Sequence, residues 1–363
     1  MNAYDLIVAG GGPAGTAAAI SAARAGAQVL LLERGNFPRH KVCGEFVSAE
    51  AIALLADLLG PDQQALLALA PRTSEARLFV DDATVRFPIE PAASLSRYDL
   101  DAALWRAAEA AGVHCQQSAT VSEIARHGEM FHVTATPALF VARAAIDATG
   151  RWSKLRPPVT ASTNGKPHWL GLKAHFKAIH DDATNDRTTD LYFFEGGYCG
   201  VQPLIGSELN VCAMVRTDVA TNLGDVFKRQ SGLHERSLGW IGATEAITTA
   251  PLIFGPPQPA HNCVLCVGDA SAFIDPFVGD GISMALRSGR LASQLLQPLW
   301  QRAAVFDEIL EAYCSEYRRH FARPLWMAGR LRKLLSAPRL IRRLFLQTMQ
   351  VPAIAEYVVA HTR

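Results

Sequence analysis

Apolar and polar positions in the first 35 residues separate into three segments. The short apolar runs YDLIVAG and AQVLLLER flank an alanine-rich stretch, GTAAAISAARAG, and glycines separate the first run from that stretch. Short β-rich runs on either side of a helical segment are typical of a strand–turn–helix–strand unit. We therefore expect the chain to begin with a βαβ unit.

Two further stretches of the first third of the chain have helical patterns. Residues 47–70 have a helical pattern, and residues 94–113 form an amphipathic one, with Ser96 as a plausible N-cap and Gly112 as its stop. Both follow the βαβ unit, as helices of an α/β domain do.

Strand patterns occupy three other regions. Residues 76–90 alternate on both sides of a two-aspartate turn, and residues 117–150 read as a hairpin followed by an apolar strand. From about 160 to 260 strand patterns dominate, which indicates an antiparallel sheet inserted between two halves of an α/β domain. The α/β pattern returns after residue 262, and 301–363 read as helices.

Composition narrows the function classes. Lys and Arg number 35 against 34 Asp and Glu, so the chain as a whole is not suited to binding a polyanion such as nucleic acid. The N-terminal segment has no cationic region and no small-residue cleavage site, and no apolar stretch reaches the roughly 18 residues of a membrane span. We expect a cytoplasmic protein, with peripheral association with the membrane as an alternative.

The seven cysteines, an odd number at scattered positions, predict reduced thiols rather than a disulfide framework. Cys263 and Cys266 form a C-x-x-C without a second Cys or His pair at ligand spacing. We interpret them as thiols of a buried apolar strand and expect no metal site.

The glycine motif of the first turn carries the first chemical prediction. Gly10, Gly12 and Gly15 stand at G-x-G-x-x-G spacing between the first strand and helix, and Glu33 ends the next strand. Such glycines allow a pyrophosphate to approach the backbone at a helix N-terminus, and the acid accepts ribose hydroxyls. The turn therefore predicts a dinucleotide site.

A second motif lies some 250 residues further on. Gly268 and Asp269 follow an apolar strand, and Gly279 and Gly281 open a long helical pattern. An Asp at a strand end is often only a helix cap. Paired with the N-terminal dinucleotide motif, however, it favours FAD, with the Asp on a ribityl or ribose hydroxyl. A third segment, DATGRWSKLR, reads as a strand–turn that ends at Gly150.

A short loop, NFPRHKVCGEF, follows the dinucleotide unit directly. It brings Lys41, Cys43 and Glu45 together, with further cations at 39 and 40, and cationic neighbours lower the pKa of a thiol. We regard these three residues as candidate catalytic groups.

Taken together, these motifs resemble the FAD-dependent oxidoreductases of the p-hydroxybenzoate hydroxylase fold, most closely the geranylgeranyl reductase group. The resemblance covers roughly residues 1–300 and rests on GGGPAG, ER, FPRHKVCGE, SRYDLDAAL, DATGRWSKLR and VGDASAFIDPFVGDGISMALRSG. It implies an enzyme with FAD as cofactor. The implied cofactor-binding residues are Gly10, Gly12, Pro13, Ala14, Gly15, Glu33, Arg34, Cys43, Gly44, Arg97, Gly150, Gly268, Asp269, Pro276, Gly279, Gly281 and Ile282.

The implied fold is α/β (α+β), with a Rossmann-like FAD-binding domain, an inserted antiparallel-sheet substrate domain and a C-terminal helical region. We place the FAD-binding domain at 1–75, 94–158 and 260–300. The substrate domain takes 76–93 and 159–259, and the helical region is 301–363.

Within this resemblance we expect reduction of a C=C bond in a lipophilic, isoprenoid- or polyketide-like substrate. Both KVCGE and PFVGDGI match the reductase pattern. A monooxygenase is the alternative, although Asp269 is followed by Ala-Ser-Ala rather than Ala-Ala-His. A halogenase is less favoured because no W-x-W-x-I-P stretch occurs, and a non-catalytic FAD-binding protein is the remaining hypothesis. The electron donor is either NAD(P)H or a separate reductase.

The C-terminal segment suggests partners. From Arg318 to Arg343 there are nine Lys and Arg and no Asp or Glu, with leucines at roughly helical spacing. A solvated basic helix face explains this pattern as well as a docking face for an acyl-carrier protein or an anionic membrane surface.

Overall fold

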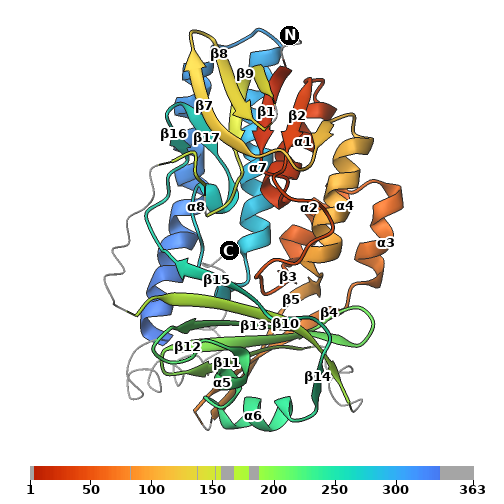
Figure 1. The fold of residues 1–363 in the computed structure, drawn as a ribbon, viewed down its shortest axis with the longest axis vertical. Helices are drawn as coiled ribbons and strands as arrows, with labels where there is room; N and C mark the ends of the chain where they lie inside the picture. Colours follow the sequence, from red (N-terminus) through yellow and green to blue (C-terminus); the bar gives the residue numbers. More distant parts are fainter. Residues whose placement is uncertain are drawn as a thin grey trace.

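The computed structural model describes residues 4–81, 83–136, 138–151, 153–156, 167–179 and 188–335. It has two layers of sheet, with helices on the upper one and at the side (Figure 1). The expected fold class, a Rossmann-like domain with a second sheet and a C-terminal helix, is confirmed.

The first sheet follows the order β16-β17-β9-β1-β2-β6, with β7 and β8 attached beside β9. Its central strands β1, β2, β9, β17 and β6 pair in parallel. The strands are β1 (Tyr4–Ala9), β2 (Val29–Leu32), β6 (His114–Gln116), β7 (Val121–His127), β8 (Met130–Ala135), β9 (Leu139–Asp147), β16 (Ala260–His261) and β17 (Val264–Cys266).

Helices cover the first sheet because their apolar faces share its core. Buried alanines of α1 and buried leucines of α4 and α7 belong to one hydrophobic cluster with β1, β2 and β9. Ser96 caps α4 as predicted, since its hydroxyl accepts the N–H groups of Tyr98 and Asp99. The helices are α1 (Pro13–Arg24), α2 (Ala49–Leu58), α3 (Pro61–Leu69), α4 (Arg97–Ala110), α7 (Gly281–Trp300) and α8 (Phe306–Leu335).

The second sheet, at the bottom of Figure 1, has the order β14-β10-β13-β12-β11-β4-β5-β3, and β15 also pairs with β10. Its pairs are antiparallel except β4 with β11, which run parallel. The strands are β3 (Phe46–Val47), β4 (Arg72–Val80), β5 (Ala83–Ser94), β10 (Trp169–Ala178), β11 (Thr188–Phe194), β12 (Gly197–Pro203), β13 (Glu208–Arg216), β14 (Trp240–Gly242) and β15 (Ile247–Leu252).

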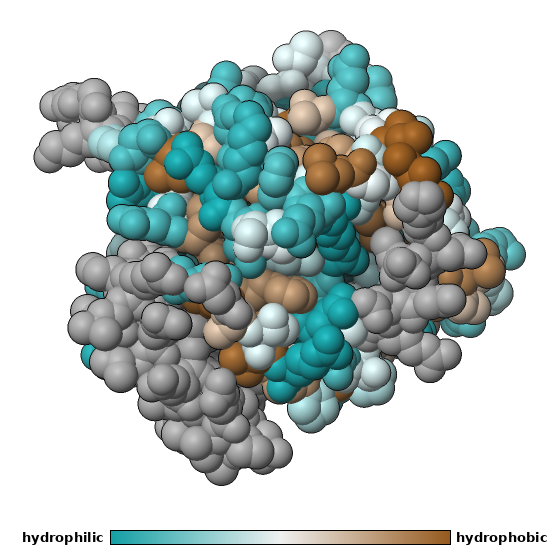
Figure 2. Space-filling model, turned by 90° about the horizontal axis from the view of Figure 1, so that it is seen from below, coloured by the Kyte–Doolittle hydropathy of each residue, from teal (hydrophilic) through white to brown (hydrophobic). Residues whose placement is uncertain are grey.

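Two short helices, α5 (Leu223–Phe227) and α6 (Ser231–Ser237), cover the outer face of this sheet. Leu170, Leu172 and Ala174 of β10 pack with them, so the alternate residues of that strand face the first domain. Seen from this outer side, the surface is mostly polar, with small separate apolar patches (Figure 2). The second sheet therefore has one face packed on helices and one face turned inward.

Two predicted details differ from the structure. β4 begins at Arg72, so the expected domain boundary at residue 76 lies inside a strand. Cys263 does not belong to the buried strand that contains Cys266: it lies in the β16–β17 turn, with φ +64°, and is partly exposed. All seven cysteines are free.

Candidate active site

A cavity of about 940 Å³ is lined by residues of both sheets. This volume is at the upper end of the roughly 300–1,000 Å³ typical of small-molecule sites. On the side of the first domain the lining includes the glycine turn, Glu33 and the start of α7, whereas the second sheet contributes apolar side chains of β4, β5 and β11. One cavity can therefore hold a cofactor and a second molecule beside it.

The glycine turn is built to receive an anion. The N-terminus of α1 has no side-chain cap and begins with Pro13, so its first N–H groups point outward without a competing side-chain acceptor. Gly15 does not line the cavity; a Cβ there would overlap the carbonyl oxygen of Gly10. The third glycine thus serves close packing of the turn, and the first two form the cavity wall.

Glu33 is held where its carboxylate borders the cavity. The N–H of Gly11 donates to Oε2 at 2.8 Å, the N–H of Gly35 donates to Oε1 at 2.9 Å, and Arg39 lies 3.1 Å from Oε1. The side chain is 5% exposed. These contacts fix the acid at the end of β2, the place at which a dinucleotide ribose is bound in Rossmann folds.

Cations gather on the same side of the cavity. Arg34, Arg39, Lys41 and Arg97 all line it. Burial, together with Arg39, Arg97 and Arg34, lowers the pKa of Lys41 to about 8. Arg97 is held by a two-bond ion pair with Asp101, at 2.6 and 2.8 Å. This local positive charge suits a pyrophosphate in a chain whose net charge is close to zero.

The second motif borders the cavity at the start of α7. Gly268, Asp269, Pro276, Gly279, Gly281 and Ile282 all contribute to the wall. The Asp269 carboxylate is one third exposed and lies 3.7 Å from Arg151, whose guanidinium stacks over Phe273. With α1 and α7 both beginning at the cavity, two helix N-termini give it a positive potential.

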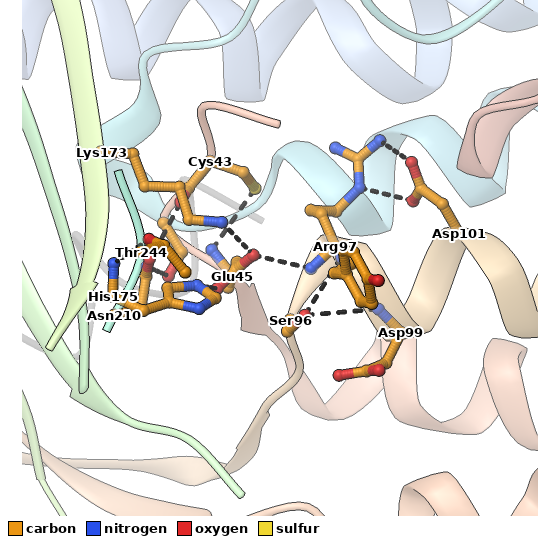
Figure 3. A network of polar contacts seen from close by, with 12 residues as sticks. Cys43, Glu45, Ser96, Arg97, Asp99, Asp101, Lys173, His175, Asn210 and Thr244 are labelled. Carbon is orange, nitrogen blue, oxygen red and sulfur yellow. Dashed lines mark hydrogen bonds and ion pairs between the residues drawn. The ribbon is translucent and has the colours of Figure 1, made fainter. Parts of the chain in front are cut away.

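The loop of the three candidate catalytic residues forms another part of the wall, since Lys41, Cys43 and Glu45 all line the cavity. Glu45 itself is fully buried and has φ +58°. Its carboxylate forms an ion pair with Lys173, lies 2.9 Å from Nε2 of His175, and accepts the N–H of Arg97 at 2.6 Å (Figure 3). These interactions with Lys173 and His175 lower the pKa of Glu45 in spite of burial.

The residues predicted from the sequence are therefore brought together: apart from Gly15, every expected cofactor-binding residue lines the cavity. The pyrophosphate-type turn, the fixed acid and the cations are what FAD requires. The roles of individual residues in binding and catalysis stay predictions.

Several residues of the site were missed. Lys173, Gln202 and Asn210 contact the Cys43–Glu45 segment. His175, for which no role was predicted, contacts Glu45. The sequence does contain a signal for Lys173 and His175: both are polar residues inside the apolar strand segment WLGLKAHF. Such a residue is rarely buried without a partner.

The basic C-terminal segment is only partly described. Arg339, Arg342 and Arg343 lie outside the described residues, and Arg332 of α8 points inward, 3.3 Å from Asp275. Docking to a carrier protein or a membrane surface stays a prediction. None of the helices in the described residues is both long and apolar enough to cross a membrane, and in those residues no group of three or more His, Cys, Asp or Glu is arranged to hold a metal ion.

Comparison with known proteins shows which proteins have a similar sequence. The family model of FAD dependent oxidoreductases matches residues 5–151. Menaquinone reductase of Mycobacterium tuberculosis is 28% identical over 94% of this chain and 86% of its own length. Digeranylgeranylglycerophospholipid reductase of Methanocella arvoryzae is 27% identical over 89% and 84%.

Solved structures show the same fold. The flavin-dependent brominase Bmp2 superposes with a TM-score of 0.79 at 19% identity, covering 99% of this chain and 93% of the brominase chain. A geranylgeranyl bacteriochlorophyll reductase-like protein of Thermoplasma acidophilum gives a TM-score of 0.73 at 20% identity, over 93% and 89%.

These findings confirm the predicted resemblance. Residues 5–151 match the FAD dependent oxidoreductase model, and named reductases align with most of this chain, in agreement with the predicted enzyme class and with FAD as the cofactor.

Proposed function

We propose that this protein reduces a carbon–carbon double bond in an extended, isoprenoid-like substrate. The observation that carries the proposal is the composition of the cavity wall. The FAD-binding elements border the same space as a set of apolar side chains from the second sheet, namely Ala76, Leu78, Phe87, Ile89, Leu191 and Phe193.

The apolar part of the wall supports a lipophilic substrate. Phe193 and Tyr198 pack against Phe277 at centroid distances of 6.4 and 6.2 Å, so aromatic rings of the second sheet meet the segment that precedes α7. A hydrocarbon chain gains stability in such surroundings because its apolar surface leaves water. An ionic substrate would find few partners on this part of the wall.

The relatives support the isoprenoid class. Two relatives that align along most of their length are named for menaquinone and for a digeranylgeranyl glycerophospholipid. The brominase shares only the fold at 19% identity, so it does not favour halogenation.

When bound, FAD supplies hydride-transfer chemistry, and the protein supplies binding, orientation and a proton. The backbone at Gly10 to Ala14, with Glu33 and the nearby cations, binds and orients the dinucleotide. We assign proton donation to the thiol of Cys43. The Glu45 carboxylate is already bound by Lys173 and His175, and Lys41 lies among three arginines. The second sheet excludes water from the hydrocarbon.

Anaerobic reduction of the FAD-loaded protein, followed by mixing with menaquinone or with a geranylgeranyl lipid, tests the proposal. We expect the flavin absorbance to return when the lipid is added. After any quinol has been reoxidised to the quinone, the lipid should still carry two extra hydrogens in its isoprenoid chain by mass spectrometry, which separates C=C reduction from reduction of the menaquinone ring. A lipid that is unchanged without oxygen but gains an oxygen atom in air identifies a monooxygenase. Reoxidation by air alone, with no product from any lipid, refutes both activities.

A further inference from the structure

A row of polar side chains crosses the inner face of the second sheet. His175 of β10 pairs in register with Asn210 of β13, and Asn210 pairs with Gln202 of β12. Each of these side chains is at most 3% exposed. Cross-strand partners project to the same side of a sheet, so the three form one line, with Lys173 two residues before His175 on the same face.

The whole row is directed at one short segment of the first domain. Gln202 donates to the carbonyl oxygen of Gly44 at 2.5 Å, and Asn210 donates to the same oxygen at 2.8 Å and to that of Cys43 at 3.2 Å. Lys173 and His175 bind the Glu45 carboxylate (Figure 3). Two successive carbonyl groups and the next side chain are therefore all held from the second sheet.

The segment is also held from the first domain. The N–H of Arg97 donates to Glu45, and the N–H of Leu95 donates to the carbonyl oxygen of Glu45 at 3.0 Å. Glu45 has a left-handed backbone, which is strained for a residue with a side chain, and surrounding contacts must maintain it.

Packing of the second sheet on the first domain does not by itself require this row of polar side chains. Apolar side chains of similar volume would join the layers without the cost of removing a Lys, a Glu and three other polar groups from water. Hydrogen bonds and a buried ion pair instead impose direction and distance. The row therefore determines where the Cys43–Glu45 segment lies.

We infer that Lys173, His175, Asn210 and Gln202 are positioning residues: they fix the Cys43–Glu45 segment in the cavity wall and so set the place of the Cys43 thiol beside the bound cofactor and substrate. Gln202 itself lines the cavity, so a molecule in the cavity touches a residue that holds the loop. The inference relies on the proposed function only in taking the cavity as the reaction site.

Two variants test the inference without leaving a buried charge unpaired. Gln202→Met removes one neutral hydrogen bond at nearly constant volume. The double variant Glu45→Gln with Lys173→Met removes both members of the ion pair together. Lys177→Met is the matched control, because Lys177 lies on the same strand as Lys173 but its side chain is 63% exposed.

The main readout is the alkylation rate of Cys43 by iodoacetamide in the FAD-free and FAD-loaded protein, measured by peptide mass spectrometry. Cys115, partly exposed in the first domain, serves as the internal reference. We expect Cys43 to react about tenfold faster in both variants, since local opening of the segment becomes easier. The visible spectrum of bound FAD should shift in the variants, and Lys177→Met should match the wild type in both measurements.

A purely structural role would lower the melting temperature and leave the Cys43 rate and the FAD spectrum unchanged; that result in folded variants overturns the inference. Neither readout uses a lipid substrate. If no lipid is reduced but Cys43 reactivity changes as expected, the proposed function fails and the positioning role stands. If lipids are reduced and Cys43 reactivity does not change, the reverse holds.

Discussion

Gly289 of α7 packs directly on the backbone of Ala14 in α1. A Cβ on Gly289 would overlap the carbonyl oxygen of Ala14 and would lie 3.0 Å from its carbonyl carbon. The first turn of α1 forms part of the cavity wall, so the α1–α7 contact determines the position of that part of the wall.

Gly289→Ala should therefore destabilise the fold by about 1–3 kcal/mol, because neither helix backbone can move without disturbing the cavity. Chemical denaturation measures the loss. Gly329→Ala is the control: in α8 no atom lies within 4 Å of the new Cβ, so this change should stabilise the protein by about 0.5–1 kcal/mol. Equal effects of the two changes would contradict the packing role of Gly289.

Glu33→Gln should weaken FAD binding by roughly 10- to 100-fold, since an uncharged amide is a poorer acceptor for ribose hydroxyls and for the N–H groups of Gly11 and Gly35. Quenching of FAD fluorescence on titration gives the dissociation constant. Glu50→Gln, at an exposed site on α2, should bind FAD as the wild type does. Unaltered affinity in the Glu33 variant would show that the acid serves only the turn.

FAD affinity should depend on pH through Lys41. Its pKa in the free protein is lowered to about 8, and the phosphates of a bound dinucleotide favour the charged ammonium and raise that pKa. Binding then takes up a proton above about pH 8, so affinity is highest below that pH and falls as the pH rises through it. Lys41→Met should bind about tenfold more weakly at pH 7 and lose this pH dependence.

Titrations of wild type, Lys41→Met and the exposed control Lys228→Met between about pH 7 and 9 separate this contribution from general effects of pH. If the Lys41 variant keeps the full slope, another group of the cavity is responsible.

Asp275 should lower stability at neutral pH. Burial raises its pKa to about 7, although Arg332 lies 3.3 Å away and opposes the shift. The folded state then binds more protons than the unfolded state between about pH 4 and 7, so stability falls as the pH rises through this window. From pH 5 to pH 8, the free energy of unfolding of Asp275→Asn should therefore rise by roughly 2–3 kcal/mol relative to that of the wild type.

Denaturation at the two pH values provides the measurement. Asp307→Asn is a suitable control, because Arg126 lowers the pKa of this exposed carboxylate and its contribution is lost only in acid. A difference between wild type and Asp275→Asn that does not change from pH 5 to pH 8 would exclude the raised pKa.

Cys43→Ser should retain FAD, since the backbone contacts that hold the segment do not involve the thiol side chain as a donor. Turnover should fall about tenfold or more, because a hydroxyl is a much weaker acid than a thiol. Absorbance of the purified protein reports flavin content, and lipid reduction reports turnover. Cys314→Ser on α8 is the control; equal turnover in both variants would leave Cys43 as a packing residue.

The sequence predicted the features that depend on local signals. The spacing of Gly10, Gly12 and Gly15, the acid at the end of β2 and the Ser96 cap each follow from a few neighbouring residues. The boundary of the second domain was placed at residue 76 because the alternating pattern was read from there, whereas pairing with β5 extends β4 back to Arg72.

What the sequence did not predict depends on register between distant strands. His175 looked like a lone histidine because its partners Asn210 and Glu45 stand 35 and 130 residues away. Cys263 was assigned to a strand because its neighbours are apolar, although the two-residue turn before Val264 requires a left-handed backbone. Such contacts are decided by tertiary packing.

The parallel pairing of β4 with β11 also affects how the chain can be made. The β4–β5 hairpin ends at Ser94 and β11 begins at Thr188, so during synthesis the hairpin emerges long before β11. Until then the edge of β4 that will receive β11 has no partner strand. Exposed strand edges recruit other chains, and pairings of such long sequence separation form slowly. The nascent protein therefore passes through a period in which this edge of the second sheet can pair with strands of other chains.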